Sequence, residues 1–150
     1  YTPSQIEGAI GTVFGVDTQL IRDGTYFVAE SGGAIVGCGG WSRRKALFGS
    51  DRGKSEEDSL LDPSFEPARI RAFFVHPDFA RRGIGQALLE ASEQAALAAG
   101  FNRIDIVATL TGEPLYRKFG YSVVERYELQ LVNQEKLPVV RLAKSLARPG

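Results

Sequence analysis

A strand, a short loop, a long amphipathic helix and a second strand follow one another between residues 69 and 108. Apolar side chains recur at helical spacing from Gly83 to Ala99, and Gly100 is the expected C-terminal cap of that helix. Two strands joined through a helix of this length need a crossover connection. The segment therefore predicts two parallel neighbouring strands at the centre of a sheet, with the helix packed on one face.

Shorter patterns on either side predict antiparallel pairs. Residues 25–30 and 34–41 suit a hairpin with its turn at 31–33, and residues 121–132 and 139–146 suit two strands around a turn at 133–138. A short helix is expected at 113–119. A further helix begins near Thr2, where Gln5 completes a capping box. We predict one α/β (α+β) domain over residues 1–150, with a mixed, mostly antiparallel central sheet flanked by helices.

The strand at 69–75 and the polar segment before it carry two further expectations. Regular alternation predicts that Ile70, Ala72 and Phe74 share one face of the sheet, and that Arg71, Phe73 and Val75 share the other. Residues 42–67 are expected to form a long loop. Such a loop is either functional or a solvated insertion, and the pattern leaves both interpretations open.

Charge and cysteine content narrow the class of protein. Formal net charge is zero, so no overall field attracts the chain to nucleic acid or to an anionic membrane. No apolar run approaches the roughly 20 residues that span a bilayer, and no signal peptide is visible. Cys38 is the only cysteine, so a reducing, cytoplasmic setting is expected. Any anion site must therefore be local.

Such a local site is predicted at residues 81–86, where the long helix begins. The first turn of a helix has unpaired backbone N–H groups and a partial positive charge, which suit a pyrophosphate. Gly83 and Gly85 leave those amides uncovered, and Arg81 and Arg82 add positive charge beside them. Ile84 and Gln86 complete the turn.

Other phosphate-binding loops fit this segment less well. A dinucleotide fingerprint needs a third glycine where Leu88 stands, and Asp105 lies inside a strand rather than at a ribose. The lysine and hydroxyl of a nucleoside-triphosphate loop are missing. A nucleotide-binding α/β domain is thus disfavoured. From these residues alone, an anion-binding loop and a helix start with two solvated arginines remain equal alternatives.

Two motifs in a fixed order distinguish these alternatives. The strand at 71–77, the loop and the helix resemble the GNAT superfamily of N-acetyltransferases, whose loop pattern Gln/Arg-x-x-Gly-x-Gly/Ala aligns on residues 80–85. Ala80 departs from the first position of that pattern. Residues 115–121, Leu-Tyr-Arg-Lys-Phe-Gly-Tyr, resemble the family segment Leu-Tyr-x-x-x-Gly-Phe/Tyr. The resemblance covers roughly residues 25–146, and the family's first strand has no counterpart here.

The resemblance implies a GNAT-like fold that uses acetyl-CoA as cosubstrate without a metal. In that family the strand before the loop splays from its neighbour, and the pantetheine arm pairs with the exposed backbone, a form of β-augmentation. The role falls here on the main chain of Phe73, Phe74 and Val75, and the amide near Val75 would polarise the thioester carbonyl. Thr109 takes a position that is often a coenzyme-contacting asparagine. Tyr116 takes the position of the general acid beside the coenzyme sulfur.

The general base is not specified by the resemblance. Some relatives carry a glutamate where Arg69 stands, and arginine cannot act as a base at neutral pH. Glu66 and Glu113 lie nearby in the sequence, and water is a further alternative. His76 is the only histidine, and its place at the end of the strand favours a structural or coenzyme-lining role.

The acceptor is equally open. Arg69 and Arg71 either select an acidic acceptor or pair with acidic loop residues such as Asp58 or Asp62. The aromatic residues Trp41 and Phe48, which flank a basic run at 43–45, either line an acceptor pocket or cover the edge of the core.

The function expected from the resemblance is transfer of an acetyl group to a primary amine of a small molecule or peptide. The alternative is a non-catalytic acyl-CoA-binding sensor or regulatory domain on the same fold. No nucleic acid or membrane partner is expected. The C-terminal hairpin offers an edge for pairing in a homodimer.

Overall fold

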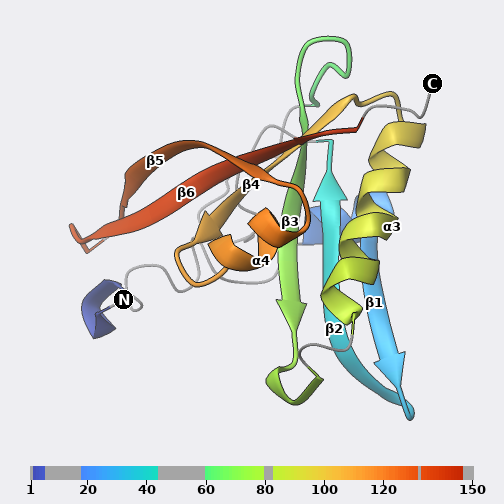
Figure 1. The fold of residues 1–150 in the computed structure, drawn as a ribbon, viewed down its shortest axis with the longest axis horizontal. Helices are drawn as coiled ribbons and strands as arrows, with labels where there is room; N and C mark the ends of the chain where they lie inside the picture. The colour runs from blue at the N-terminus through green and yellow to red at the C-terminus, as the bar shows by residue number, and fades with distance from the viewer. Residues whose placement is uncertain (1, 6–17, 44–59, 80–82, 132, 147–150) are drawn as a thin grey trace.

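The computed structural model describes residues 2–5, 18–43, 60–79, 83–131 and 133–146, and each structural statement refers to these residues. Nine α-helices and strands and one short 3-10 turn follow one another in this part of the chain (Figure 1). In order they are α2 (Thr18–Asp23), β1 (Tyr26–Ser31), β2 (Ala34–Ser42), β3 (Ala68–Val75), η1 (Pro77–Phe79), α3 (Ile84–Ala98), β4 (Arg103–Thr109), α4 (Glu113–Lys118), β5 (Ser122–Gln130) and β6 (Lys136–Ser145).

The strands form one mixed sheet in the order β1-β2-β3-β4-β6-β5. Only β3 and β4 pair in parallel, and the crossover between them contains α3. The other four pairings are antiparallel. The predicted fold class is therefore confirmed, including the parallel pair at the centre of the sheet. α3 and α4 lie over the same face of the sheet (Figure 1), and α3 contacts β1, β2 and β3.

The main core lies between that face of the sheet and α3. It is built from apolar positions that alternate along the strands, and Leu89 and Ala96 of α3 pack into it. Ile104 and Ile106 of β4 belong to this core, so Arg103 and Asp105, which alternate with them, lie on the opposite face of the sheet. A smaller cluster of Leu131, Leu137 and Val139, with Val107, Tyr127 and Leu129 packed against it, is built on β4, β5 and β6.

A β-bulge in β3 corrects the predicted alternation. Gly40 pairs with Arg71 and Cys38 pairs with Phe74, so Ala72 and Phe73 together lie opposite Gly39. One extra residue in a strand reverses the face of every side chain that follows it. Ile70 and Phe73 consequently pack against the same core, although alternation places them on opposite faces. Phe74 is 54% exposed.

β3 and β4 separate immediately after they pair. Their parallel ladder contains only Ala68 with Ile104 and Arg69 with Asp105. Beyond that point the two strands diverge, and α4 lies between their carboxyl ends (Figure 1). The splay that the family resemblance implies is thus present, and it leaves a gap between Val75 and Thr109.

The ends of the elements differ from the prediction mainly in β6. This strand begins at Lys136, whereas the sequence suggested a turn that extends to Pro138. The ladder with β4 starts only at Val139, so Pro138 lies where β6 pairs with β5 alone, a place that tolerates proline. At the N-terminus, the N–H of Thr2 donates to Oε1 of Gln5 and the N–H of Gln5 donates to Oγ1 of Thr2. The predicted capping box is confirmed.

Most of the predicted long loop, residues 44–59, lies outside the described residues. The same holds for residues 6–17 of the predicted first helix. No described helix is long and apolar enough to cross a membrane.

Candidate active site

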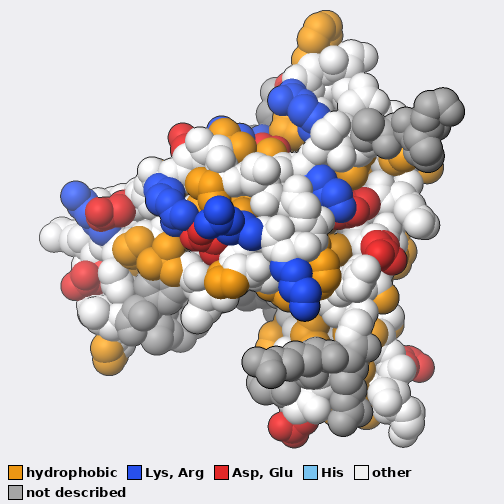
Figure 2. Space-filling view, viewed as in Figure 1, with side chains coloured by type: hydrophobic (Ala, Val, Ile, Leu, Met, Phe, Trp, Pro, Cys, Tyr) orange, Lys and Arg blue, Asp and Glu red, His pale blue; other side chains and the backbone are white. Residues whose placement is uncertain are grey.

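The predicted site residues gather around the gap between the carboxyl ends of β3 and β4. In the space-filling view the molecule is notched beside this gap, and lysine and arginine side chains are gathered over α4 and the strands next to it (Figure 2). Ligands of α/β proteins commonly bind at such places, because neighbouring elements part there and leave main-chain groups uncovered. The gap is therefore the first place to test for a site.

Tyr116 forms one wall of the gap. Its ring, in α4, meets the ring of Phe73 in β3 edge to face, with centroids 5.8 Å apart. Tyr121 meets Tyr116 in the same manner at 6.1 Å. These contacts hold Tyr116 between the two separated strands. Burial raises the pKa of its hydroxyl well above the ordinary value near 10, so the group is a proton donor at neutral pH.

A polar network anchors this aromatic group to α3. The hydroxyl of Tyr121 donates to Oε2 of Glu93 at 2.7 Å, and Lys144 donates to Oε1 of the same carboxylate at 2.9 Å. The Lys144 ammonium also lies 5.6 Å from the centre of the Tyr121 ring. The network joins α3, β6 and the segment after α4, so the position of Tyr116 depends on three elements.

The start of α3 lies on the other side of the gap. Gly83 caps the helix with φ +78°, a left-handed conformation that favours glycine, and no side chain of the described residues caps the first turn. A β-carbon on Gly83 would meet nothing within 4 Å. The N–H groups of Ile84, Gly85 and Gln86 have no carbonyl of their own helix to pair with. These N–H groups are therefore available to an anion.

Gly85 joins this helix end to β3. A β-carbon at Gly85 would lie 3.6 Å from Cζ of Phe73 and 3.8 Å from Cγ2 of Val75. The helix start, the end of β3 and the ring of Tyr116 are thus contiguous through Phe73. The Gln86 side chain instead donates to Glu90 in the next turn. Arg81 and Arg82, together with Ala80, lie outside the described residues.

Thr109 ends β4 at the far side of the gap. Its hydroxyl accepts the N–H of Gly112 at 3.3 Å and lies 3.2 Å from the hydroxyl of Thr111. The hydroxyl therefore shapes the turn into α4. This bond leaves the hydroxyl able to donate only towards Thr111 or a ligand.

The three residues considered as bases or proton carriers occupy different environments. Glu113 accepts two hydrogen bonds of 2.7 Å from Arg126 and one of 3.3 Å from Arg117. The bonds from Arg126 lower the pKa of Glu113, which makes it a poor base. Glu66 lies before the first residue of β3. That residue stands five positions before Phe73, or roughly 16 Å of extended chain, so Glu66 is far from the gap. His76 accepts the N–H of Asp78 through Nδ1 at 3.1 Å, which is a structural role.

Arg71 and Trp41 both serve the fold. The Arg71 guanidinium is buried and donates to the hydroxyl of Ser42 at 3.2 Å. Trp41 is 2% exposed and packs edge to face on Phe101 at 5.9 Å, so it belongs to the core rather than to a pocket wall. The Arg43 guanidinium lies 5.1 Å from the centre of the Trp41 ring. Phe48 and Asp58 lie outside the described residues.

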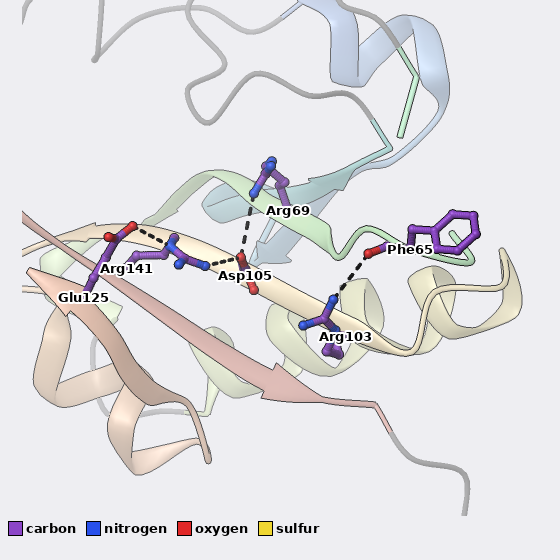
Figure 3. A network of polar contacts seen from close by, with 6 residues as sticks. All are labelled: Phe65, Arg69, Arg103, Asp105, Glu125 and Arg141. Carbon is purple, nitrogen blue, oxygen red and sulfur yellow. Dashed lines mark hydrogen bonds and ion pairs between the residues drawn. The ribbon is translucent and has the colours of Figure 1, made fainter. Parts of the chain in front are cut away.

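Arg69 is part of a polar group that the sequence analysis missed. It lies 3.7 Å from Asp105, which also accepts a hydrogen bond of 3.0 Å from Arg141 (Figure 3). Burial lowers the pKa of Arg69, which remains charged at neutral pH. The signal in the sequence was a pair of charged residues, Arg103 and Asp105, at alternate positions of the apolar strand β4. A strand in the middle of a sheet that is covered on both faces would be apolar throughout, so the charges mark a face with polar partners.

Comparison with known families agrees with this geometry. A family model described as acetyltransferase (GNAT) domain matches residues 22–123. No curated protein matches the chain significantly in sequence.

Several solved structures share the fold. Ard1 from Thermoplasma volcanium is 16% identical with a TM-score of 0.63, and the match covers 99% of this chain and 95% of Ard1. The putative acetyltransferase yncA from Salmonella typhimurium, solved with its cofactor acetyl-CoA, is 14% identical with a TM-score of 0.63, over 98% of this chain and 86% of that one. A GCN5-related N-acetyltransferase from Rhodopseudomonas palustris is 23% identical with a TM-score of 0.61, and the match covers 85% of this chain but only 65% of that protein.

Proposed function

This chain belongs to the acetyltransferase (GNAT) family, and on that premise we propose that it transfers the acetyl group of acetyl-CoA to a primary amine of a small molecule or peptide. The observation that carries the proposal is the gap between β3 and β4, with an uncapped helix start on one side and a buried tyrosine on the other. One structural relative is a complex with acetyl-CoA.

The start of α3 is the proposed pyrophosphate site. The N–H groups of Ile84, Gly85 and Gln86 point out of the first turn, where the helix dipole favours an anion. The absence of a side-chain cap on that turn supports this role, since a cap would compete with a phosphate oxygen. Arg81 and Arg82 precede the turn in sequence and would add positive charge.

The end of β3 is the proposed site for the pantetheine arm. Beyond Arg69 this strand has no ladder to β4, so main-chain groups of Phe73, Phe74 and Val75 can pair with an added extended chain. The exposed side chain of Phe74 is compatible with that role, because the contact needs only the backbone. Thr109, across the gap, is proposed to contact the coenzyme from β4.

Acetyl-CoA, when bound, supplies a thioester whose carbon–sulfur bond is exchanged for a carbon–nitrogen bond. Tyr116 is proposed to donate its proton to the departing thiolate. The ordinary pKa values of a phenol and a thiol are close. Burial raises the pKa of Tyr116, so its hydroxyl is a weaker acid than a free phenol and stabilises the thiolate first as a hydrogen-bond donor. The main-chain N–H near Val75 is proposed to stabilise the negative charge that develops on the carbonyl oxygen.

The proton of the amine needs a separate acceptor. Glu113 is held by two arginines and Glu66 lies at the far end of β3, so neither is well placed. Water is therefore the proposed proton acceptor, or the amine enters already neutral. The rate should then rise with pH as the acceptor amine loses its proton.

Calorimetry with acetyl-CoA and release of CoA thiol across a panel of amines test the proposal. Gly85→Glu should abolish acetyl-CoA binding, because the new carboxylate would enter the space beside Phe73 and repel the pyrophosphate. Gln94→Glu is the matched control, since it adds the same charge at an exposed position of the same helix. If the wild-type protein binds no acetyl-CoA, the proposal is wrong.

The alternative is an acyl-CoA sensor that binds the coenzyme without turnover. Two observations favour the sensor. Position 69 is an arginine, and the carboxylate of Glu113 is paired with arginines that lower its pKa, so neither residue is a working base. Acetyl-CoA binding without thiol release from any amine would support the sensor. Turnover that falls in Tyr116→Phe would exclude it.

A further inference from the structure

A hollow of about 370 Å³ lies on the sheet face opposite α3. Side chains from four neighbouring strands, β3, β4, β5 and β6, contribute to it (Figure 3). The lining residues are Pro67, Arg69, Arg103, Asp105, Glu125 and Arg141. Among the described residues, three guanidinium groups and two carboxylates line the hollow, and the charge of Glu66 also acts on Arg69.

The carboxylates are already engaged. Asp105, only 5% exposed, lies between Arg141 at 3.0 Å and Arg69 at 3.7 Å. The Nε of Arg141 donates to Glu125 at 2.9 Å. Among the described residues Arg103 donates to the main-chain carbonyl of Phe65, at a long 3.4 Å, and no carboxylate there lies within salt-bridge distance of it. Arg103 is therefore the guanidinium of the lining that is most available to a bound anion.

Two buried donors of this region lack partners. Neither Nε of Arg69 nor the hydroxyl of Tyr127 has a hydrogen bond in the described part of the chain. Burial raises the pKa of the Tyr127 hydroxyl, and the charges of Glu125, Arg141 and Arg69 also act on it. A buried polar group without a partner destabilises the folded protein. Of the two donors, Arg69 lines the hollow, so an oxygen anion there would offer its guanidinium an acceptor.

The hollow also has a defined position relative to the gap. Arg69 and Asp105 form the last pair of the β3–β4 ladder, so the hollow lies at the point from which the gap opens. Phe73 and Thr109, at the open part of the gap, are each four residues further along their strands, which is roughly 13 Å of extended chain. That length matches a short peptide.

We propose that the hollow binds the carboxylate of the acceptor, so that the acceptor is a short peptide or similar amine that carries a carboxylate at its other end. Arg103 is the one guanidinium of the lining without a carboxylate partner among the described residues, which favours a monoanion over a phosphate. That the other end of the bound molecule is an acetylated amine rests on the proposed acetyl transfer. Binding of a carboxylate in the hollow does not depend on it.

Glycine peptides of one to four residues, each as the free carboxylate and as the carboxamide, provide the test. Release of CoA thiol gives kcat/KM for each, and calorimetry without acetyl-CoA gives binding. For the best length, the carboxylate should be at least tenfold better than its carboxamide in kcat/KM or in affinity. If carboxamides equal carboxylates at every length in both measurements, the inference is wrong.

Variants identify the groups responsible. Arg103→Gln should reduce the preference for carboxylate about tenfold, and Arg22→Gln, which removes an exposed arginine from α2, should not change it. Tyr127→Phe should leave stability unchanged, since the hydroxyl has no hydrogen-bond partner in the described part of the chain. A carboxylate preference unchanged in Arg103→Gln would overturn the assignment.

The two proposals fail separately. If the wild-type protein binds the carboxylate peptides but not acetyl-CoA, the proposal of acetyl transfer is wrong and the anion site stands. Turnover of peptides and carboxamides alike would support acetyl transfer and overturn the anion site.

Discussion

The ring of Tyr116 in α4 lies edge to face on the ring of Phe73 in β3, with centroids 5.8 Å apart and planes at 66°. The contact joins the helix α4 to β3. Because β3 and β4 share only two ladder pairs, this contact fixes the width of the gap where the two strands no longer pair. Phe73 reaches this position through the bulge opposite Gly39. The proposed proton donor is therefore positioned by an irregularity in the strand that would bind the coenzyme.

Replacement of Tyr116 by phenylalanine should separate chemistry from packing. The ring contacts with Phe73 and Tyr121 are kept and only the hydroxyl is lost. We expect kcat to fall about 100-fold, in the range of general acid catalysis. Acetyl-CoA affinity by calorimetry should stay within about twofold, since no binding group is removed. An unchanged kcat would contradict the role of the hydroxyl.

The stability of the protein should fall in alkaline solution. Burial raises the pKa values of Tyr116 and Tyr121 above the unfolded value of about 10. Above pH 10 the unfolded chain loses these protons while the folded chain keeps them, so unfolding becomes more favourable. Each tyrosine should contribute about 1.4 kcal/mol per pH unit. Urea unfolding between pH 9 and pH 11.5 measures the slope, which should be smaller in Tyr116→Phe.

The sequence predicted the order and type of the described elements except for the helix α2 and the short turn η1, because the crossover and the hairpins depend on local periodicity. It failed at the bulge. A register shift between Cys38 and Gly40 depends on how β2 and β3 pair, and alternation within residues 69–75 carries no trace of it. The limit of β6 was wrong for a similar reason, since Pro138 is tolerated only because β4 ends beside Val139.

The candidate site divides in the same way. Motifs with fixed spacing gave the start of α3 and Tyr116, and the structure brings them together through Phe73. The arginine hollow combines residues of four strands that are far apart in sequence, so the charged pair Arg103 and Asp105 in β4 was the one local signal of it. Glu113 was a candidate base because of its position alone. Its bonds to Arg126, 13 residues away, changed that interpretation.

The two glycines at the start of α3 should respond differently to alanine. Gly83 has φ +78° and open space around it, so Gly83→Ala should cost about 1–2 kcal/mol through backbone strain alone. Gly85 lies within the helix and its added β-carbon would make ordinary contacts at 3.6 to 3.9 Å, so Gly85→Ala should gain about 0.5–1 kcal/mol. Equal effects in chemical denaturation would contradict the conformation of Gly83.

The two carboxylates that accept from Arg141 should differ in their importance. Asp105 is 5% exposed and lies between two arginines, so Asp105→Asn should destabilise the protein by about 3–5 kcal/mol through uncompensated buried charge. Glu125 is 53% exposed, and Glu125→Gln should cost less than about 1 kcal/mol. Urea denaturation at pH 7 compares them. A loss for Asp105→Asn no larger than that for Glu125→Gln would show that burial does not govern this group.

Alanine at Gly39 should disturb the site through the bulge. An added β-carbon would lie 2.8 Å from Cδ2 and 3.3 Å from Cα of Phe73, so the ring must move and the backbone must give slightly. Overpacking of this kind costs about 1–3 kcal/mol. Because Phe73 packs on Tyr116, kcat should fall as well, although Gly39 touches neither proposed reaction partner.

Gly33→Ala provides the comparison for this last prediction. Gly33 lies in the β1–β2 turn with φ +83° and nothing within 4 Å of an added β-carbon, so its replacement strains the backbone without reaching Phe73. It should lower stability by about 1–2 kcal/mol and leave kcat unchanged. If both variants lower kcat in proportion to stability, the Gly39 effect is general destabilisation. If only Gly39→Ala lowers kcat, the width of the gap set by Phe73 and Tyr116 controls the reaction.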